Sequence, residues 1–490
     1  MGPPKVHERP EATTDRSISG PRDRDLTFPG PSTHSPAKPP LDAPATTPQS
    51  VSMDRRAFSR LSATALAGLA LPSPMAGLYH GRRRDLRVSG ARLNGWLTEM
   101  SRFGANAAGG VDRVAYSDAD LEGRAFISGL MREAGLDVSV DLVGNIWGQR
   151  AGSDATLPPL VLGSHTDSVP NGGNFDGPLG SLGAVEAAWT LEEAGVTTRH
   201  PLSFVVFSNE EGGKTGSRAL IGEVSPTELD LPTASGYTIA EGIRRIGGDP
   251  ARLAEVRLQP GSISGFLELH IEQGATLDRA GEDIGVVLGI VGIMRWNVEV
   301  VGAANHAGTT PMRQRRDAMV AAARFTDMVY TTVTDWQGNQ VATVGRVHVE
   351  PNAPNVIPGK VTLSLEIRDL SMDTITEIQR ELEGRAVIIG EETGTTFTSH
   401  RFYTSDAAPT SPSIQDMVEE SARDLGLTTW RMPSGAGHDA QSMAKLGPMG
   451  MIFVPSVGGI SHAPDEFTAP EDNTNGADVL LRSLMALDRG

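Results

Sequence analysis

The sequence contains no cysteine, and positive charge is scarce in it relative to negative charge. Without cysteine, disulfide bonds, a thiolate nucleophile and cysteine-built zinc fingers are all excluded, so any metal site must use His, Asp and Glu. The 490-residue chain has 43 Lys and Arg against 60 Asp and Glu, a formal net charge of −17. Because nucleic acid and anionic membranes are bound through a basic face, we expect neither as a nonspecific partner.

Proline is absent between Pro74 and Pro158 but frequent at the N-terminus, where eleven of the 33 prolines precede residue 50. Residues 1–52 mix Pro, Ser, Thr and charged residues without apolar periodicity. Such a segment cannot bury enough apolar surface to order itself. It is predicted to be disordered or an upstream extension, and it is left out of the fold.

Residues 53–80 have the layout of an export signal. Met53-Asp-Arg-Arg-Ala-Phe-Ser-Arg is charged, a run of small and apolar residues extends from Leu61 to Leu71, and Pro-Ser-Pro-Met-Ala follows. The arginine pair followed by Phe58 resembles a twin-arginine signal, and the apolar run is shorter than the ~20 residues that span a bilayer. We expect export to the periplasm or cell exterior, with Met53 as the true start; the alternative is an ordinary amphipathic helix on a cytoplasmic protein.

The remainder of the chain alternates strand-like and helix-like segments. Short apolar runs predict buried strands, and three of these runs lead into ionisable residues: His165, Glu210-Glu211 and His270. Open α/β sheets build their sites at the carboxyl ends of successive strands. We therefore predict an α/β catalytic domain in which these residues lie close together.

A different pattern begins near residue 293. A strand with period-two alternation starts at Arg295, and the segments that follow complete the order β-α-β-β-α-β. This predicts a small α+β sandwich at residues 293–404. It would be inserted into the α/β domain, whose two parts are residues 85–292 and 405–490.

The predicted strand ends carry the residue types of a metal centre. His165 and Asp176 lie in the stretch GSHTDSVPNGGNFDG, and the carboxylate of Asp176 could bridge two ions. Asp167 is placed to accept the second imidazole N–H of His165 and so fix its tautomer. The side chains of Glu210 and Glu211 point different ways, so that one can bind metal while the other takes a proton from water.

His270 and His462 complete five N and O ligands. Five are enough for two ions that share Asp176 at the separation of about 3.5–4 Å typical of two-metal hydrolases. Each residue alone has a plainer interpretation, as a structural histidine, a turn aspartate or a solvated glutamate pair. Together, at the ends of buried strands, they favour a metal site.

Several long motifs carry a family resemblance over roughly residues 90–490: GSHTDSVPNGGNFDG, SNEEGG, ELHIEQG, GAANHAGTTPM, PNVIPG with LEIRD, SGAGHDA and FVPSVGGISHAPDE. They resemble the dinuclear-metal amidases of the M20 peptidase superfamily, and most closely its hydantoinase/carbamoylase branch. That branch comprises N-carbamoyl-L-amino-acid hydrolases, β-ureidopropionases and allantoate amidohydrolases. The resemblance implies a mixed-sheet zinc-hydrolase catalytic domain with a smaller inserted lid and dimerisation domain.

The resemblance also implies the roles of the metal-site residues. Two divalent ions would be held, one by His165, Asp176 and His270 and the other by Asp176, Glu211 and His462, with Glu210 as the general base. Zinc is the first expectation for this ligand set, and manganese or cobalt also suits a carboxylate-rich site.

Further positions match substrate contacts of the family. His306 resembles its transition-state donor, supplied from the inserted domain of a partner subunit. Asn355 and Arg368 match positions that hold the substrate carboxylate, and Gln273 matches a polar contact beside the metals. His438 is expected to touch the substrate or to support the metal ligands.

The implied function is hydrolysis of a linear C–N amide or ureido bond in a small carboxylated substrate, of N-carbamoyl-L-amino acid or allantoate type, by a homodimer. Two alternatives remain: an aminoacylase or dipeptidase of the wider superfamily, and a metal-free binding protein on the same fold. The loop that follows Glu211 is several residues shorter than the family pattern. This departure leaves the choice of substrate and the strength of the second ion site open.

Overall fold

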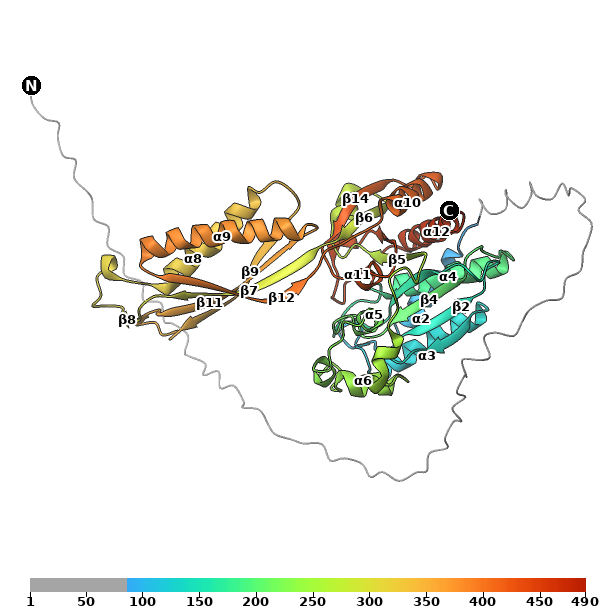
Figure 1. Ribbon diagram of the computed structural model, residues 1–490, viewed down its shortest axis with the longest axis horizontal. Helices are drawn as coiled ribbons and strands as arrows, with labels where there is room; N and C mark the ends of the chain where they lie inside the picture. The colour runs from blue at the N-terminus through green and yellow to red at the C-terminus, as the bar shows by residue number, and fades with distance from the viewer. Residues whose placement is uncertain (1–85) are drawn as a thin grey trace, which may run out of the picture. The chain divides into compact units, whose positions relative to one another are not determined.

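The computed structural model describes residues 86–490, so the predicted extension at 1–52 and the predicted export signal at 53–80 lie outside the described residues. The larger sheet has nine strands, ordered β1-β2-β4-β3-β5-β15-β6-β13, with β14 paired to β6 (Figure 1). Its strands are β1 (Asp137–Val140), β2 (Ile146–Arg150), β3 (Leu160–His165), β4 (Leu202–Phe207), β5 (Gly265–Ile271), β6 (Ile284–Ile290), β13 (Ala408–Pro409), β14 (Thr429–Ser434) and β15 (Met449–Val454). Strands β4, β3, β5 and β15 are mutually parallel, whereas β2 and β6 run antiparallel to them. The mixed sheet confirms the predicted α/β class.

The central strands are apolar throughout because both faces of the sheet are covered. In β3, Leu160 and Leu162 belong to one hydrophobic cluster, and Val161 belongs to another. Alternate residues of a strand point to opposite faces, so these two clusters are the cores on the two sides. The first cluster packs against α2 (Gly90–Met100), α3 (Asp118–Glu133), α4 (Pro178–Glu193), α10 (Pro412–Asp424) and α12 (Pro470–Leu487). The second includes residues of α5 (Thr215–Leu220), α7 (Thr276–Ala280) and α11 (Ala440–Met443), and α6 (Ile239–Arg245) belongs to a separate cluster.

Helix α4 lies directly against the strands that carry the site. It begins with Pro178, which is favoured in the first turn because its missing N–H has no partner to lose there. A Cβ on Gly180 would come within 2.1 Å of the carbonyl oxygen of Leu269 in β5. Only glycine permits this approach of helix to strand, so the start of α4, and the loop before it, is fixed against β5.

A second sheet of four antiparallel strands has the order β12-β7-β11-β9 and its own hydrophobic cluster. Its strands are β7 (Gly292–Val301), β9 (Val341–Glu350), β11 (Lys360–Asp369) and β12 (Thr396–Ser405), and its helices are α8 (Ala318–Thr334) and α9 (Met372–Thr393). Both helices lie along one face of this sheet (Figure 1). Along β11 the residues alternate between buried and half-buried, as expected of a sheet covered on one side.

Two short strands, β8 (Asn305–His306) and β10 (Val356–Ile357), pair with each other in an additional small sheet. Within residues 86–490, no helix is both long and apolar enough to cross a membrane.

Candidate metal centre

Neighbouring parallel strands bring the predicted ligands to one edge of the large sheet. His165 is the last residue of β3, and its register partner in β4 is Phe207, three residues before Glu210. His270 lies in β5 on the other side of β3. The side chains of His165, Glu210 and His270 are nearly or completely buried. The carboxyl ends of β4, β3 and β5 therefore bring together Glu210, His165 and His270, the residues that the sequence predicts as the base and two of the ligands.

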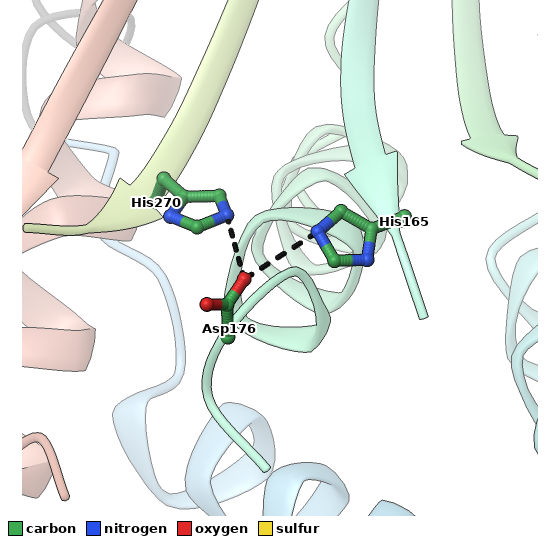
Figure 2. Close-up of side chains that lie close together, drawn as sticks. All are labelled: His165, Asp176 and His270. Carbon is green, nitrogen blue, oxygen red and sulfur yellow. Dashed lines mark ion pairs between the residues drawn. The ribbon is translucent and has the colours of Figure 1, made fainter. Parts of the chain in front are cut away.

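Asp176 lies between the two histidines, in the loop that leads into α4 (Figure 2). Its Oδ1 is 3.5 Å from Nε2 of His165 and 3.2 Å from Nε2 of His270. The next residue, Gly177, has φ +81°, and a Cβ there would come within 2.4 Å of the His165 ring. The glycine thus lets the loop turn sharply enough to place the carboxylate against the imidazole.

The tautomers of both histidines are set by main-chain carbonyl groups. Nδ1 of His165 donates to the carbonyl oxygen of Asp167 at 3.0 Å, and Nδ1 of His270 donates to that of Ile271 at 2.9 Å. With the proton on Nδ1, each Nε2 faces Asp176 and is available to a cation bound between them. This is the arrangement in which a histidine binds a metal ion.

Asp167 therefore plays a different part from the one predicted. Its carboxylate Oδ1 is 3.7 Å from Nδ1 of His165, too far for the expected hydrogen bond. Instead its two oxygens accept the backbone N–H groups of Glu210 and Glu211, at 3.3 and 3.2 Å. The main-chain carbonyl is closer to the ring, which frees the carboxylate to tie the loop after β3 to the loop after β4.

The second predicted ion site is assembled from three loops. Nε2 of His462 lies 3.3 Å from Oδ2 of Asp176 and 3.4 Å from Oε1 of Glu211. Ligand atoms of this group, like those of His165, Asp176 and His270, lie within 4.8 Å of one another. Asp176 is common to both groups and offers a different oxygen to each.

Glu466 joins two of these loops and was not predicted. One of its oxygens accepts the N–H groups of Phe175 and Asp176, at 2.8 and 3.0 Å. The other accepts from Oγ of Ser461 at 2.9 Å and from the N–H of His462 at 3.3 Å. The only sequence signal for Glu466 is its position four residues after His462, a candidate ligand. Most of its contacts are with main-chain N–H groups, which every residue except proline has, so they could not be predicted from the sequence.

The cluster holds an excess of negative charge. Burial raises the pKa of Glu210 to about 7, although the charges of His165 and Lys214 act in the opposite direction. Burial, reinforced by the charge of Asp176, raises the pKa of Glu211 to about 8. The hydrogen bond to Asp176 raises the pKa of His462 to about 9. All three groups thus tend to keep a proton, which is what a bound cation would replace.

The residues present fit divalent metal ions. His270 Nε2 is completely buried and has no hydrogen-bond partner among the described residues, although Asp176 is near it. A buried ring nitrogen without a partner is costly unless it binds something. The donors are imidazole nitrogens and carboxylate oxygens, a set suited to zinc, manganese or cobalt.

His438 lies behind the centre and is not open to a substrate. It is 2% exposed, its Nε2 is 2.8 Å from Oγ of Ser434, and its ring packs edge-on against His270 with centroids 4.5 Å apart. Glu268 lies beside it and accepts from Ser164 Oγ and the N–H of Ala440. Of the two roles expected for His438, contact with the substrate or support of the metal ligands, its burial and its contact with the His270 ring favour the second.

Gln273 and Arg368 lie near each other on one side of the centre. Nε2 of Gln273 donates to Oδ2 of Asp176 at 2.5 Å. Arg368 donates through Nε to Glu366 at 2.7 Å and through Nη1 to the carbonyl of Gly435 at 2.6 Å. Both residues line one cleft.

His306 and Asn355 are brought together with each other but not with the metal ligands. The N–H of Ala307 donates to the carbonyl of Asn355 at 3.0 Å, and His306 pairs with Val356 across β8 and β10. Within the described part of this one chain, neither residue is hydrogen-bonded to a member of the cluster. Both are exposed.

The loop after Glu211 is short and positively charged at its end. Lys214 has φ +57°, and its N–H donates to the carbonyl of Glu210 at 2.8 Å. Its ammonium group donates to Oε1 of Gln441.

Asn209, Gln273 and His462 also have positive φ values between 52° and 60°. Such strain in residues other than glycine is typical of functional sites.

Comparison with known proteins agrees with this geometry. Residues 161–486 match the family model described as Peptidase family M20/M25/M40. An N-carbamoyl-L-amino acid amidohydrolase of Geobacillus stearothermophilus is 38% identical over 408 residues, which cover 82% of this chain and 100% of that protein. A ureidoglycolate hydrolase of Arabidopsis thaliana is 34% identical over 420 residues, 82% of this chain and 87% of that one. A solved structure of an amidase of the hydantoinase/carbamoylase family from Burkholderia multivorans is similar with a TM-score of 0.77 and 36% identity, covering 83% of this chain and 99% of that one.

Proposed function

Since this chain belongs to peptidase family M20/M25/M40, we propose that it is a metal-dependent amidohydrolase that cleaves a linear C–N amide or ureido bond. The substrate would be a small carboxylated compound of N-carbamoyl-L-amino acid or allantoate type. The observation that carries the proposal is the convergence of two ligand groups on Asp176 with Glu210 beside them. The names of the similar proteins support the C–N bond class.

Two divalent ions, zinc by preference, would be held by the two groups that share Asp176. When bound, they lower the pKa of a water molecule and polarise a substrate carbonyl group. Gln273 donates a hydrogen bond to Oδ2 of Asp176 at 2.5 Å, and the hydroxyl of Ser461 lies 2.9 Å from the same oxygen and shares its one proton between Asp176 and Glu466. These bonds keep the shared carboxylate in place between the groups.

Glu210 is the residue that moves the proton. Its backbone is held by Asp167, and its carboxylate oxygens accept no hydrogen bond from a described residue. A buried carboxyl group whose oxygens have no other partner can accept a proton and then return it. It takes the proton of the attacking water as the C–O bond forms, and gives it to the nitrogen as the C–N bond breaks. From an N-carbamoyl substrate, this step leaves the amino acid and carbamate, and the carbamate decomposes to ammonia and carbon dioxide.

His306 is prepared to act as a neutral hydrogen-bond donor. Its Nδ1 accepts the N–H groups of Gly308 and Thr309, at 3.0 and 3.2 Å. The ring proton therefore sits on Nε2, which is free to donate to an oxyanion. Because neither His306 nor Asn355 touches the centre of its own chain, they would serve the centre of a second copy in a homodimer.

In this arrangement residues 293–404 are the inserted lid and dimerisation domain. The proposal is supported by the separate four-stranded sheet and its own core, which lie between the two stretches of chain that build the large sheet. Arg368, on β11 of this domain, would hold the substrate carboxylate.

The export signal proposed for residues 53–80 would place the enzyme in the periplasm or outside the cell. Transport of folded proteins by the twin-arginine route suits an enzyme that binds its metals before export. A fusion of residues 53–80 to a reporter should be exported, and should stay inside the cell when both arginines are replaced by lysine.

The function is tested by a substrate panel assayed with zinc, manganese and cobalt. N-carbamoyl amino acids, allantoate and acyl-amino acids are incubated with the protein, and ammonia and amino acid release are measured. Ammonia release that requires metal supports the proposal. Activity on acyl-amino acids alone would indicate an aminoacylase or dipeptidase, and the absence of bound metal with no turnover would indicate a binding protein.

A further inference from the structure

A cleft of about 700 Å³ lies next to the centre, and the part of its wall formed by Trp430, Met432 and Pro433 has no role in the proposed reaction. Gln273, which donates to Asp176, lines it together with Arg368, Trp430, Met432 and Pro433. The cleft is therefore continuous with the proposed site, and Gln273 is the residue that the two share.

The sheet register places Trp430 level with the metal ligands. Trp430 is opposite Gly285 in β6, Gly285 is opposite Phe453 in β15, and Phe453 is opposite His270 in β5. Neighbouring strands are about 4.8 Å apart, so Trp430 is displaced from His270 by roughly 14 Å along this row. That length suits a small substrate whose one end reaches the metals and whose other end reaches the indole.

Most charged groups that line the cleft already have protein partners. The carboxylate of Glu272 accepts the N–H groups of Thr276 and Leu277, both at 2.7 Å. The guanidinium of Arg431 is paired with Asp416 and Glu419.

Arg368 is the exception among these lining residues. Its Nε and Nη1 have partners, but its Nη2 has none among the described residues. The cleft therefore offers one free guanidinium edge, which suits a single carboxylate group.

The uncharged wall includes the polar residues Thr276 and Asn339, but the part formed by Trp430, Met432 and Pro433 is apolar and aromatic. Trp430 is 47% exposed, and its ring stacks on no described aromatic residue and under no described cation. Met432 and Pro433 follow it in β14. A large half-exposed indole beside a free cationic edge suits a ligand with a carboxylate at one position and an apolar ring at another.

We infer that this cleft receives the side chain of the substrate and selects N-carbamoyl amino acids with a large apolar, above all aromatic, side chain. The inference rests on the proposed function and narrows it. A second ureido arm, as in allantoate, needs hydrogen-bond partners that Trp430, Met432 and Pro433 do not supply, and an unpartnered polar group costs binding energy.

The test compares the full-length, metal-loaded protein and its Trp430→Ala variant. For the unaltered protein, kcat/KM for N-carbamoyl-L-phenylalanine should exceed that for N-carbamoylglycine and for allantoate at least about tenfold. Trp430→Ala should lower the phenylalanine value about tenfold, mainly through KM, and change the glycine value less than about twofold. Trp430→Phe should restore most of the loss. Trp96→Ala, which removes a partly exposed indole from α2, is the matched control and should change neither value.

Binding separates this inference from the proposed function. In Glu210→Gln, calorimetry with the same two N-carbamoyl compounds measures selection without turnover. Tighter binding of the phenylalanine compound by Glu210→Gln, lost when Trp430→Ala is added, supports the role of the cleft. This holds even if the unaltered protein hydrolyses neither compound, because absence of hydrolysis would contradict only the proposed function. Equal binding of the two compounds, or equal losses for both in Trp430→Ala, overturns the inference.

Discussion

Glu466 accepts the backbone N–H of Asp176 at 3.0 Å, and its second oxygen accepts the backbone N–H of His462 at 3.3 Å. A single carboxylate thus fixes the distance between Asp176, the proposed bridging ligand, and His462, a proposed ligand of the second ion. Glu466→Gln keeps the size of the side chain but puts an NH₂ group where an acceptor is needed for one of the loops. We expect metal affinity to fall about 10–100-fold, the range typical for groups that support ligands.

Metal affinity in Glu466→Gln is measured by competition with a chromophoric chelator, and the increase in Tm on adding zinc should shrink in parallel. Glu420→Gln, at an exposed position of α10, is the control. An unchanged metal affinity in Glu466→Gln would show that the loops hold their places without this carboxylate.

Replacing His462 separates the two ion sites. His462→Ala removes one ligand from the group with Asp176 and Glu211 but leaves His165, Asp176 and His270 in place. We expect the bound metal to fall from two ions to one per chain, measured by elemental analysis after dialysis. His400→Ala, on β12 of the second sheet, should keep both ions. Loss of both ions in His462→Ala would mean that the sites do not fill independently.

Glu210→Gln should keep both ions and lose turnover. The amide cannot accept the proton of water, and removal of a general base typically costs a factor of about 10²–10⁴ in kcat. Metal content and kcat are measured on the same preparation. Activity close to that of the unaltered protein would assign the proton transfer to another group.

Arg368→Ala should act on substrate binding more than on chemistry. A hydrogen bond to a charged group contributes about 1.5–3 kcal/mol, so KM for carboxylated substrates should rise roughly 10–150-fold with kcat changed little. Arg368→Lys keeps the charge but loses the planar fork and should lie in between. The comparison needs a substrate amide without a carboxylate, for which KM should not change. An unchanged KM for the acid would place its binding site elsewhere.

Asp120 should make stability depend on pH. It is buried beneath the site, accepts the N–H of Tyr116 at 2.8 Å, and burial raises its pKa to about 6. The folded protein then binds more protons than the unfolded chain between about pH 4 and 6, so this group lowers the free energy of unfolding as pH rises through that window.

Asn in place of Asp120 resembles the protonated acid at every pH. Relative to the unaltered protein, Asp120→Asn should therefore gain about 1.4 kcal/mol of stability as the pH is raised from 5 to 7.5. Urea unfolding of both proteins, stripped of metal by chelation, gives the difference. A difference that is the same at both pH values would contradict the assignment.

The ligand-bearing strands could be predicted because each is a short apolar run that leads into ionisable residues. The apolar run before His165 is β3, the run before Glu210 is β4, and the run before His270 is β5. The closeness of these residues, which lie far apart in the sequence, could be predicted because neighbouring parallel strands end at the same edge of a sheet. The group that fixes the tautomer of His165 could not be predicted. The choice between the carboxylate and the carbonyl of Asp167 depends on distances that the residue type does not determine.

Other elements gave weaker signals. Strand β6, at Ile284–Ile290, contains two glycines, and only Val291 lies between it and β7. The sequence pattern therefore does not distinguish it as a strand of its own. The second helix of the predicted β-α-β-β-α-β order is α9, which extends from Met372 to Thr393. Gly384 lowers the helix propensity of its second half, whereas burial of Ala386 and Ile389 against the second sheet stabilises it.

The order of the ligands along the chain has a consequence for biosynthesis. Strand β15, at 449–454, is inserted between β5 and β6, which are made earlier, and His462 follows it. A nascent polypeptide therefore cannot complete the large sheet, or bring His462 to Asp176 and Glu211, until the residues up to His462 have left the ribosome. Binding of a second cation at the proposed site would thus require the whole of this stretch to be made.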